Sequence, residues 1–286
     1  MCGIVGAVCN RDVFGILIEG LKRLEYRGYD SAGLSLIDAN SCLNTQKTIG
    51  RVADLEDLFN GEIPNGGLGI AHTRWATHGV PSSANSHPHT SGSISVVHNG
   101  IIENHTLLKK ELRDRGATLS SETDSEVIAH LIEFYSSETG SLKEAVNKTL
   151  SRLEGAYAIC VISKDYPDKM IGARSGSPLV IGLGIGEHFM ASDQMALRQV
   201  TDRFIYLEEG DVAEVSKNEI SVFDDNGELV EREINQINES DLLSEKGEYK
   251  HFMLKEIFEQ PRVIDECLRG RISGSNIVPS IFGHAA

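Results

Sequence analysis

Met1-Cys2-Gly3-Ile4-Val5-Gly6-Ala7-Val8-Cys9 opens the chain and places a thiol directly behind the initiator methionine. The apolar run from Gly3 to Cys9 has the composition of a buried β-strand. Removal of Met1 would leave a thiol and a free α-amine on Cys2. Their ordinary pKa values are about 8.5 and about 8, so the amine could take the thiol proton near neutral pH. Cys2 is therefore either a nucleophile that carries its own base or a small residue without function, and the two interpretations weigh equally at this point.

Length and charge limit the classes of protein that fit. The 286 residues allow one large domain or two small ones. With 27 basic against 42 acidic residues the net charge is −15, which argues against nucleic acid or an anionic membrane surface as the main partner. The odd number of cysteines without a CxxC pair predicts a reduced, cytoplasmic protein: Cys2, Cys9, Cys42, Cys160 and Cys267. No signal peptide or spanning segment is expected.

Short β-type runs dominate the order of elements. They are 3–9, 32–37, 67–72, 94–98, 156–162, 169–173, 178–182, 204–206, 212–215 and 220–223. Helical patterns interrupt them at 12–28, 104–116, 124–135 and 141–153, and Asp12, Asn104 and Ser141 are the predicted N-caps of three of them. Strands and helices do not alternate strictly, and hairpin-like pairs are frequent late in the chain. We therefore predict an α+β fold of antiparallel sheets with helices outside.

Two polar clusters follow predicted strands. Arg74 in the segment Thr73–Gly79 suits bidentate capture of a carboxylate, and a surface ion pair is its ordinary alternative. Trp75, the single tryptophan, could equally be a core anchor. Asn99 and Gly100 could supply a side-chain amide and a backbone N–H to an oxyanion. An Asn-Gly pair more often forms a plain turn.

A third cluster, Ser121–Asp124, has helix capping by Thr123 or Asp124 as its ordinary interpretation. A carboxylate there is free to receive an ammonium group only if its neighbour is the cap. Neither a metal nor a cofactor is predicted. Six histidines gather between His72 and His105, but their spacing matches no metal motif. The Gly182-x-Gly184-x-Gly186 run lacks the Gly-Lys-Ser/Thr of a phosphate loop, and a turn between strands is the better interpretation.

Together these clusters supply a thiol nucleophile, an amine base, an oxyanion pair, a carboxylate clamp and an ammonium acceptor. Such a set suits cleavage of the side-chain amide of a free α-amino acid. Glutamine fits best, so we predict a thiol amidohydrolase.

These residues resemble the class II glutamine amidotransferases, the N-terminal-nucleophile group that begins with a mature cysteine. Within that family the resemblance is to the branch that aminates fructose 6-phosphate to glucosamine 6-phosphate. Amidophosphoribosyltransferases share the Cys2 start but not the first, tyrosine-rich block. The matching stretches are Leu24–Gly33, Thr73–His78, His87–His89, His98–Asn104, Ser121–Asp124, Arg174–Leu179 and Met253–Pro261.

The resemblance implies a four-layer αββα sandwich and a role for each matching residue. Cys2 would be the nucleophile, with Asn99 and the Gly100 amide as the oxyanion hole. Arg74 would bind the glutamine α-carboxylate, with Thr77 and His78 beside it, and Asp124 would bind the α-ammonium. Trp75 would gate the passage of ammonia, and Arg27 would belong to a loop that closes over the site.

The resemblance also implies a second half that this sequence lacks, two sugar-isomerase subdomains that bind fructose 6-phosphate. We expect a glutaminase domain over 2–224 and, over 225–286, a linker toward the absent isomerase domain. Truncation is favoured because 277–286 ends mid-pattern, and the full-length protein is expected to be a homodimer. Two rivals stay open: the same glutaminase site feeding another acceptor, such as phosphoribosyl pyrophosphate, and a non-catalytic glutamine-binding module.

Overall fold

The computed structural model describes residues 2–59, 64–76, 79–237, 249–268, 272–273 and 276–277. The chain divides into two compact units, Met1–Ile237 and Asn238–Ala286. The second unit contains α6 (Phe252–Leu268) and the short hairpin of β16 (Ile272–Ser273) and β17 (Asn276–Ile277). Within the described part of the chain, no helix is long and apolar enough to cross a membrane.

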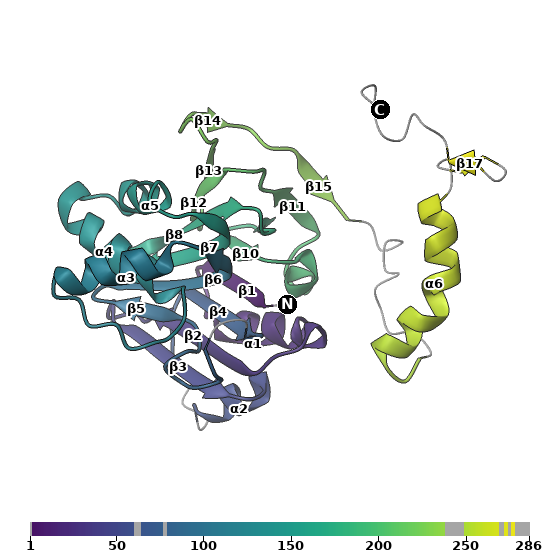
Figure 1. Cartoon of the computed structure of the whole chain (residues 1–286), viewed down its shortest axis with the longest axis horizontal. Helices are drawn as coiled ribbons and strands as arrows, with labels where there is room; N and C mark the ends of the chain where they lie inside the picture. Colours follow the sequence, from purple (N-terminus) through teal and green to yellow (C-terminus); the bar gives the residue numbers. More distant parts are fainter. Residues whose placement is uncertain are drawn as a thin grey trace. The chain divides into compact units, whose positions relative to one another are not determined.

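The first unit contains two antiparallel sheets (Figure 1). In the eight-stranded sheet β1 lies at the centre, between β10 and β4, and the order is β15-β11-β9-β10-β1-β4-β2-β3. The bounds are β1 (Gly3–Cys9), β2 (Ser31–Ile37), β3 (Leu43–Ile49), β4 (Leu68–Arg74), β9 (Val180–Leu183), β10 (Glu187–Ala191), β11 (Arg203–Tyr206) and β15 (Ile234–Gln236).

The seven-stranded sheet has the order β14-β13-β12-β8-β7-β6-β5. Its strands are β5 (His89–Ser91), β6 (Ile94–Ile102), β7 (Gly155–Ser163), β8 (Tyr166–Ser175), β12 (Val212–Ser216), β13 (Ile220–Phe223) and β14 (Leu229–Val230). Two strands beyond residue 224, β14 and β15, pair within the sheets, and the compact unit runs to Ile237.

Helices cover the outer faces of the two sheets. Buried apolar residues of α1 (Phe14–Lys22) and α2 (Val52–Asp57) join one cluster with the eight-stranded sheet. A second cluster lies between the sheets, and a third joins the seven-stranded sheet to α3 (His105–Asp114), α4 (Glu126–Thr139) and α5 (Leu142–Leu150). This four-layer αββα sandwich confirms the predicted α+β fold (Figure 1).

The alternation of side chains along β1 and β4 determines what faces the space between the sheets. Ile4 and Val8 of β1 belong to the cluster between the sheets, as do Leu68 and Ile70 of β4. Because every second residue of a strand shares a face, Cys2 continues the inner face of β1. By the same rule His72 and Arg74 continue the inner face of β4.

The predicted cap at Asp12 is wrong. α1 begins after Val13, and the Asp12 carboxylate instead accepts a hydrogen bond of 2.9 Å from the Gly66 backbone N–H. A tertiary contact with the segment before β4 thus replaces the local cap. Ser141 does cap α5 as predicted, since its hydroxyl accepts from the Glu144 N–H at 3.5 Å.

Asn104 occupies the N-cap position of α3, but its side chain makes no cap bond. Its amide donates to the Arg152 carbonyl at 2.8 Å and accepts from the Glu154 N–H at 3.2 Å. The side chain therefore ties the start of α3 to the segment before β7. The glycine run Gly182–Gly186 lies at the turn between β9 and β10, which confirms its interpretation as a turn between strands.

Candidate active site

The Cys2 thiol lies at the end of β4. Antiparallel pairing of β1 with β4 aligns Gly3 with Thr73, which brings Cys2 beside Arg74 and Trp75 at the end of β4. The Cys2 Sγ atom accepts a hydrogen bond from the Trp75 backbone N–H at 3.2 Å and lies 3.6 Å from the Trp75 carbonyl oxygen. The thiol is thus held by backbone groups of the segment that contains the predicted carboxylate clamp.

Asn99 reaches Cys2 from the other sheet. Its side-chain nitrogen Nδ2 donates to the Cys2 carbonyl oxygen at 3.1 Å. Asn99 and Gly100 lie inside β6, paired with Ala158 and Tyr157 of β7, so this Asn-Gly pair is not a plain turn.

Gly100 has a backbone conformation that only glycine adopts readily here. Its φ is +140°, and a β-carbon at this position would be 2.0 Å from the Ala156 carbonyl oxygen. Glycine is therefore required here by the close approach of β7, and Gly100 lines the same cavity as Cys2.

Arg74 is buried, with 4% of its side chain exposed. Its guanidinium lies 3.6 Å from Asp30 Oδ1 and donates to the Gly79 carbonyl at 3.0 Å. The Asp30 carboxylate also accepts from the Ser31 hydroxyl at 2.8 Å and from the Ala76 N–H. The alternative of a surface ion pair is therefore wrong, because this charge lies inside the site.

Asp124 is also buried and does not cap α4, whose N-cap residue is Ser125. The Asp124 Oδ2 atom accepts from the Ile102 backbone N–H at 2.7 Å, and Oδ1 lies 3.5 Å from the Ser125 hydroxyl. The carboxylate is thereby anchored at the end of β6, on the same cavity as the Cys2 thiol.

A cavity of about 30 Å³ joins these groups. Its lining residues are Cys2, Arg74, Trp75, His87, His98, Gly100, Thr123, Asp124 and Ser125. Because one water needs about 10–15 Å³ by this measure, the cavity accommodates about two waters and is too small for glutamine. Side chains around it must move for an amino acid to enter.

The electrostatic surroundings keep the Cys2 thiol protonated. Burial raises the pKa of the thiol, while the Trp75 N–H and the charge of Arg74 lower it without cancelling that effect. A thiol with a raised pKa needs a nearby proton acceptor to become a nucleophile at neutral pH.

The predicted gate and loop residues contact neighbouring segments. Trp75 is 53% exposed, so it is not a core anchor. Arg27 lies in the short 3-10 helix η1 (Glu25–Arg27) and forms an ion pair with Asp193, just before η2 (Gln194–Leu197). Thr77 and His78 lie outside the described residues, and their predicted roles stay predictions.

Four of the histidines that the sequence offers as metal ligands lie in or next to the site, and His87 and His98 line its cavity. His72, His87, His89 and His98 are all buried, and the ring of His87 lies 4.2 Å from that of His72 and 4.6 Å from that of His89. No group of three or more His, Cys, Asp or Glu among the described residues could hold a metal ion. The strand alternation that places His72 beside Arg74 is the signal that could have identified it.

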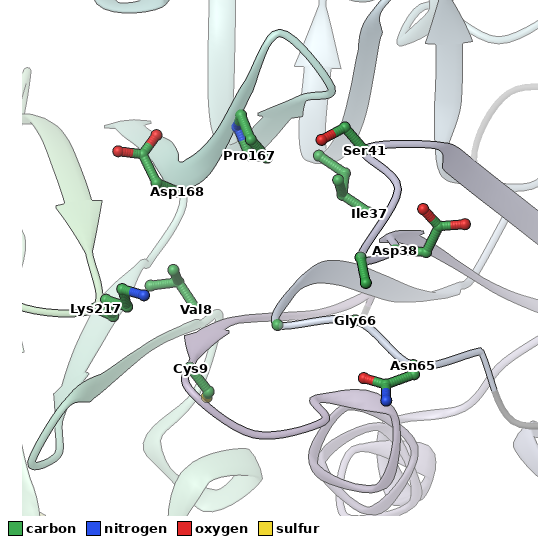
Figure 2. A pocket seen from close by; sticks show the side chains of 12 residues that line it. Val8, Cys9, Ile37, Asp38, Ser41, Asn65, Gly66, Pro167, Asp168 and Lys217 are labelled. Atoms are coloured by element: carbon green, nitrogen blue, oxygen red, sulfur yellow. The ribbon is translucent and has the colours of Figure 1, made fainter.

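A larger cavity of about 310 Å³ lies at the opposite end of β1 and is not the site of this chemistry. Its lining includes Cys9, Asp38, Asp168 and Lys217, whose side chains Figure 2 shows around the opening, and none of the predicted site residues. Burial, with the adjacent Glu187 carboxylate, raises the pKa of Cys9 to about 12. That thiol is therefore inert near neutral pH.

Comparison with known proteins agrees with this arrangement. The family described as a glutamine amidotransferase domain matches residues 72–199. The glutamine–fructose-6-phosphate aminotransferase of Vibrio vulnificus (strain CMCP6) is 55% identical over 283 residues, which are 99% of this chain and 46% of that protein. The enzyme of the same name from Pseudomonas putida is 54% identical over 287 residues, which cover 100% of this chain and 47% of that protein. The chain thus spans about half the length of the curated relatives it matches.

Solved structures share the fold. A glutamine phosphoribosylpyrophosphate amidotransferase from B. subtilis superposes with a TM-score of 0.63 at 27% identity, over 83% of this chain and 50% of the other. A class-II glutamine aminotransferase domain protein from Silicibacter pomeroyi gives 0.52 at 14% identity, over 78% and 99% respectively, which shows the fold alone. The chain is thus a homologue of the glutamine–fructose-6-phosphate aminotransferases and carries a class II glutamine amidotransferase domain with the N-terminal-nucleophile fold.

Proposed function

We propose that this domain hydrolyses L-glutamine to glutamate and ammonia through a thioester on Cys2. The observation that carries the proposal is the meeting of four groups at one small cavity: the Cys2 thiol, the backbone of Gly100, the Arg74 guanidinium and the Asp124 carboxylate. The Asn99 amide nitrogen adds a donor 3.1 Å from the Cys2 carbonyl oxygen.

Removal of Met1, once and before catalysis, frees the α-amine of Cys2. In the first half-reaction this amine takes the thiol proton. The sulfur then attacks the carboxamide carbon of glutamine, a C–S bond forms, and the carbonyl oxygen becomes an oxyanion. Asn99 Nδ2 and the Gly100 N–H donate to that oxygen, and each such donor is worth about 3–4 kcal/mol in acyl transfer. The ammonium of Cys2 returns its proton to the leaving nitrogen as the C–N bond breaks, which releases ammonia.

In the second half-reaction, water attacks the thioester carbon. The α-amine accepts a proton from the water, the C–S bond breaks, and the proton returns to the sulfur as glutamate leaves. The sum is glutamine and water to glutamate and ammonia, so the thiol and the amine are both regenerated.

Arg74 and Asp124 are proposed to recognise the free amino acid. Arg74 is proposed to bind the α-carboxylate, with Thr77 and His78 beside it, and Asp124 the α-ammonium. Arg27 is proposed to belong to the segment that closes over the bound amino acid, and Trp75 to gate the departure of ammonia.

The names of the relatives support fructose 6-phosphate as the acceptor of that ammonia, with glucosamine 6-phosphate as the product. The sugar would be bound by a part of the protein beyond this sequence, and a homodimer is the proposed assembly. Phosphoribosyl pyrophosphate remains the second candidate acceptor, because a solved amidotransferase that names it in its title shares the fold at 27% identity. Assay of a full-length protein that contains this domain, with either acceptor, separates the two.

The experiment that tests the glutaminase combines two measurements. Intact-mass spectrometry should find Met1 removed, and a coupled glutamate assay should find hydrolysis that Cys2→Ala abolishes while circular dichroism stays unchanged. Cys42→Ala is the matched control, because Cys42 is an exposed thiol outside the cavity and its loss should leave the rate unchanged. Glutamine binding without turnover, with Met1 retained, would instead identify a non-catalytic glutamine-binding module.

A further inference from the structure

The Asn99 amide can serve an oxyanion only if its nitrogen, and not its oxygen, faces Cys2. The two ends of a side-chain amide have nearly the same shape, so packing alone does not choose between them. A flipped amide would set its oxygen against the developing negative charge. Some neighbour of Asn99 must therefore select the orientation.

His72 is a neighbour in contact with the Asn99 amide. Its side chain is fully buried on the inner face of β4, and it crosses to β6 of the other sheet. The His72 Nε2 atom lies 2.9 Å from Asn99 Oδ1 and 3.1 Å from the His98 carbonyl oxygen.

The backbone contact settles which end of the amide His72 meets. A carbonyl oxygen only accepts hydrogen bonds, so the His72 Nε2 atom beside the His98 carbonyl must carry the proton. An N–H that donates to Asn99 requires an acceptor there, which is Oδ1. The other end of the amide, Nδ2, meets the Cys2 carbonyl oxygen at 3.1 Å, a second acceptor that demands a donor. The carbonyl groups of His98 and Cys2 therefore both require the same orientation of the Asn99 amide.

The proton on His72 is not titrated in the working range of an enzyme. Burial lowers the pKa of His72 to about 3, although its bonds to Asn99 and the His98 carbonyl favour the charged ring. His72 is therefore neutral near pH 7, with one proton placed on Nε2, and it neither takes protons from Cys2 nor gives them to it.

We propose that His72 is a positioning residue that holds the Asn99 amide with its nitrogen toward Cys2 and thereby builds the oxyanion hole. The kinetic part of this inference rests on the proposed glutaminase function. His72 touches no reacting atom in it and acts only through Asn99. Its loss should therefore slow the chemical step without weakening substrate binding.

The kinetic test compares His72→Leu, which has no donor, with His72→Gln, whose amide N–H reaches the Nε2 position. We expect kcat for glutamine hydrolysis to fall about 10²–10³-fold in His72→Leu, the cost of one oxyanion donor, with KM changed less than about threefold. His72→Gln should recover part of kcat. Alkylation of Cys2 by iodoacetamide should be unchanged in both, because that reaction forms no oxyanion.

His188→Leu is the matched control. His188 is also a buried histidine of the eight-stranded sheet, and its Nδ1 bonds to the Ser216 carbonyl at 2.7 Å, away from the cavity around Cys2. The His188→Leu variant should lose stability as His72→Leu does. Its kcat, calculated for the fraction of protein whose Cys2 reacts with iodoacetamide, should equal that of the wild type. Equal kcat in His72→Leu and wild type, or parallel losses of kcat in both histidine variants, would overturn the proposal.

A measurement without turnover separates this inference from the proposed function. The two Asn99 Nδ2 protons, followed by ¹⁵N–¹H NMR and assigned with Asn99→Ala, should give two sharp, slowly exchanging signals in the wild-type chain. In His72→Leu these signals should shift and exchange faster with solvent. If the wild-type chain does not hydrolyse glutamine, the glutaminase proposal fails, while these signals still decide the role of His72. Unchanged Asn99 signals in His72→Leu would refute that role.

Discussion

The ring of Trp75 lies against the α-carbon of Gly28, so closely that a β-carbon on residue 28 would be 1.8 Å from Trp75 Cζ3. Gly28 has a φ of +88°, a conformation that glycine adopts at little cost. The contact joins the segment after β4, which holds the Cys2 thiol, to the segment before β2, which holds Arg27. Movement of one segment must therefore disturb the other.

Gly28→Ala should displace the Trp75 ring, because the new methyl group and the ring cannot share the space. Trp75 is the single tryptophan, so intrinsic fluorescence reports on this contact alone. We expect a red-shifted emission and stronger quenching by acrylamide in Gly28→Ala. Gly116→Ala is the control, since Gly116 has a similar φ of +90° with open space around its α-carbon. Identical spectra for Gly28→Ala and wild type would show that the ring does not depend on the contact.

Alkylation of Cys2 should need alkaline pH. Burial raises the pKa of the thiol, and iodoacetamide reacts with the thiolate, so the rate should rise with a midpoint above the ordinary value of about 8.5. Arg74→Met should move the midpoint further up, because the Arg74 charge stabilises the thiolate. Peptide mass spectrometry follows Cys2 separately from the other cysteines. A midpoint below that of N-acetylcysteine would contradict the raised pKa.

Gly100→Ala should disrupt the pairing of β6 with β7. The new β-carbon would be 2.0 Å from the Ala156 carbonyl, and the φ of +140° adds backbone strain. We expect a loss of at least about 2–3 kcal/mol in the free energy of unfolding, measured in urea, and loss of glutaminase activity. Gly227→Ala, at a φ of +78° with no atom within 4 Å, should cost only about 1 kcal/mol. Similar costs for the two variants would refute the clash.

Glu126→Gln should destabilise the protein more at neutral pH than in acid. Burial raises the pKa of the Glu126 carboxyl, but contacts with His130 and hydrogen bonds from Ser120 and Ser121 outweigh it and lower the pKa below its usual range. A carboxyl with a lowered folded-state pKa stabilises the fold above its unfolded value of about 4.3, and this contribution is lost as the pH falls through the folded value. The loss at pH 7 should be about 1–3 kcal/mol.

Urea titrations at pH 7 and at about pH 3 measure this difference. Glu138→Gln provides the control, because Glu138 is half-exposed in a surface pair with Lys148 and should change stability by less than about 1 kcal/mol. If the difference in free energy of unfolding between wild type and Glu126→Gln were larger at about pH 3 than at pH 7, the lowered pKa of Glu126 would be contradicted.

The sequence predicts strands that form short apolar runs and misses strands that contain or begin with polar residues. β1 and β13 have the predicted bounds. β3 was not predicted, because Asn44, Gln46 and Lys47 make it look like a loop, and only its place at the edge of a sheet allows so polar a strand. β10 was missed for a similar reason, since Glu187 at its start is polar and is stabilised by a 2.7 Å bond from the distant Arg11.

The site was predictable as a set of residues but not as a geometry. Cys2, Arg74 and Asp124 were singled out for their chemistry, and they line one cavity. The sequence does not say that β4 and β6, which belong to different sheets, end beside the same thiol. It also favours a turn at Asn99-Gly100, and only the pairing with β7 shows that these residues lie in a strand. The partner of His72 could not be found for the same reason.

The guanidinium of Arg74 is already compensated by Asp30 within the chain. In the proposed binding mode, an amino acid whose carboxylate displaces Asp30 from Arg74 gains only the difference between two similar attractions. Affinity for the amino acid should accordingly be modest, and turnover should track its supply over a wide concentration range. If Arg74 binds glutamine as proposed, this internal competition with Asp30 predicts that the rate of ammonia release rises gradually with glutamine concentration and does not saturate when glutamine is scarce.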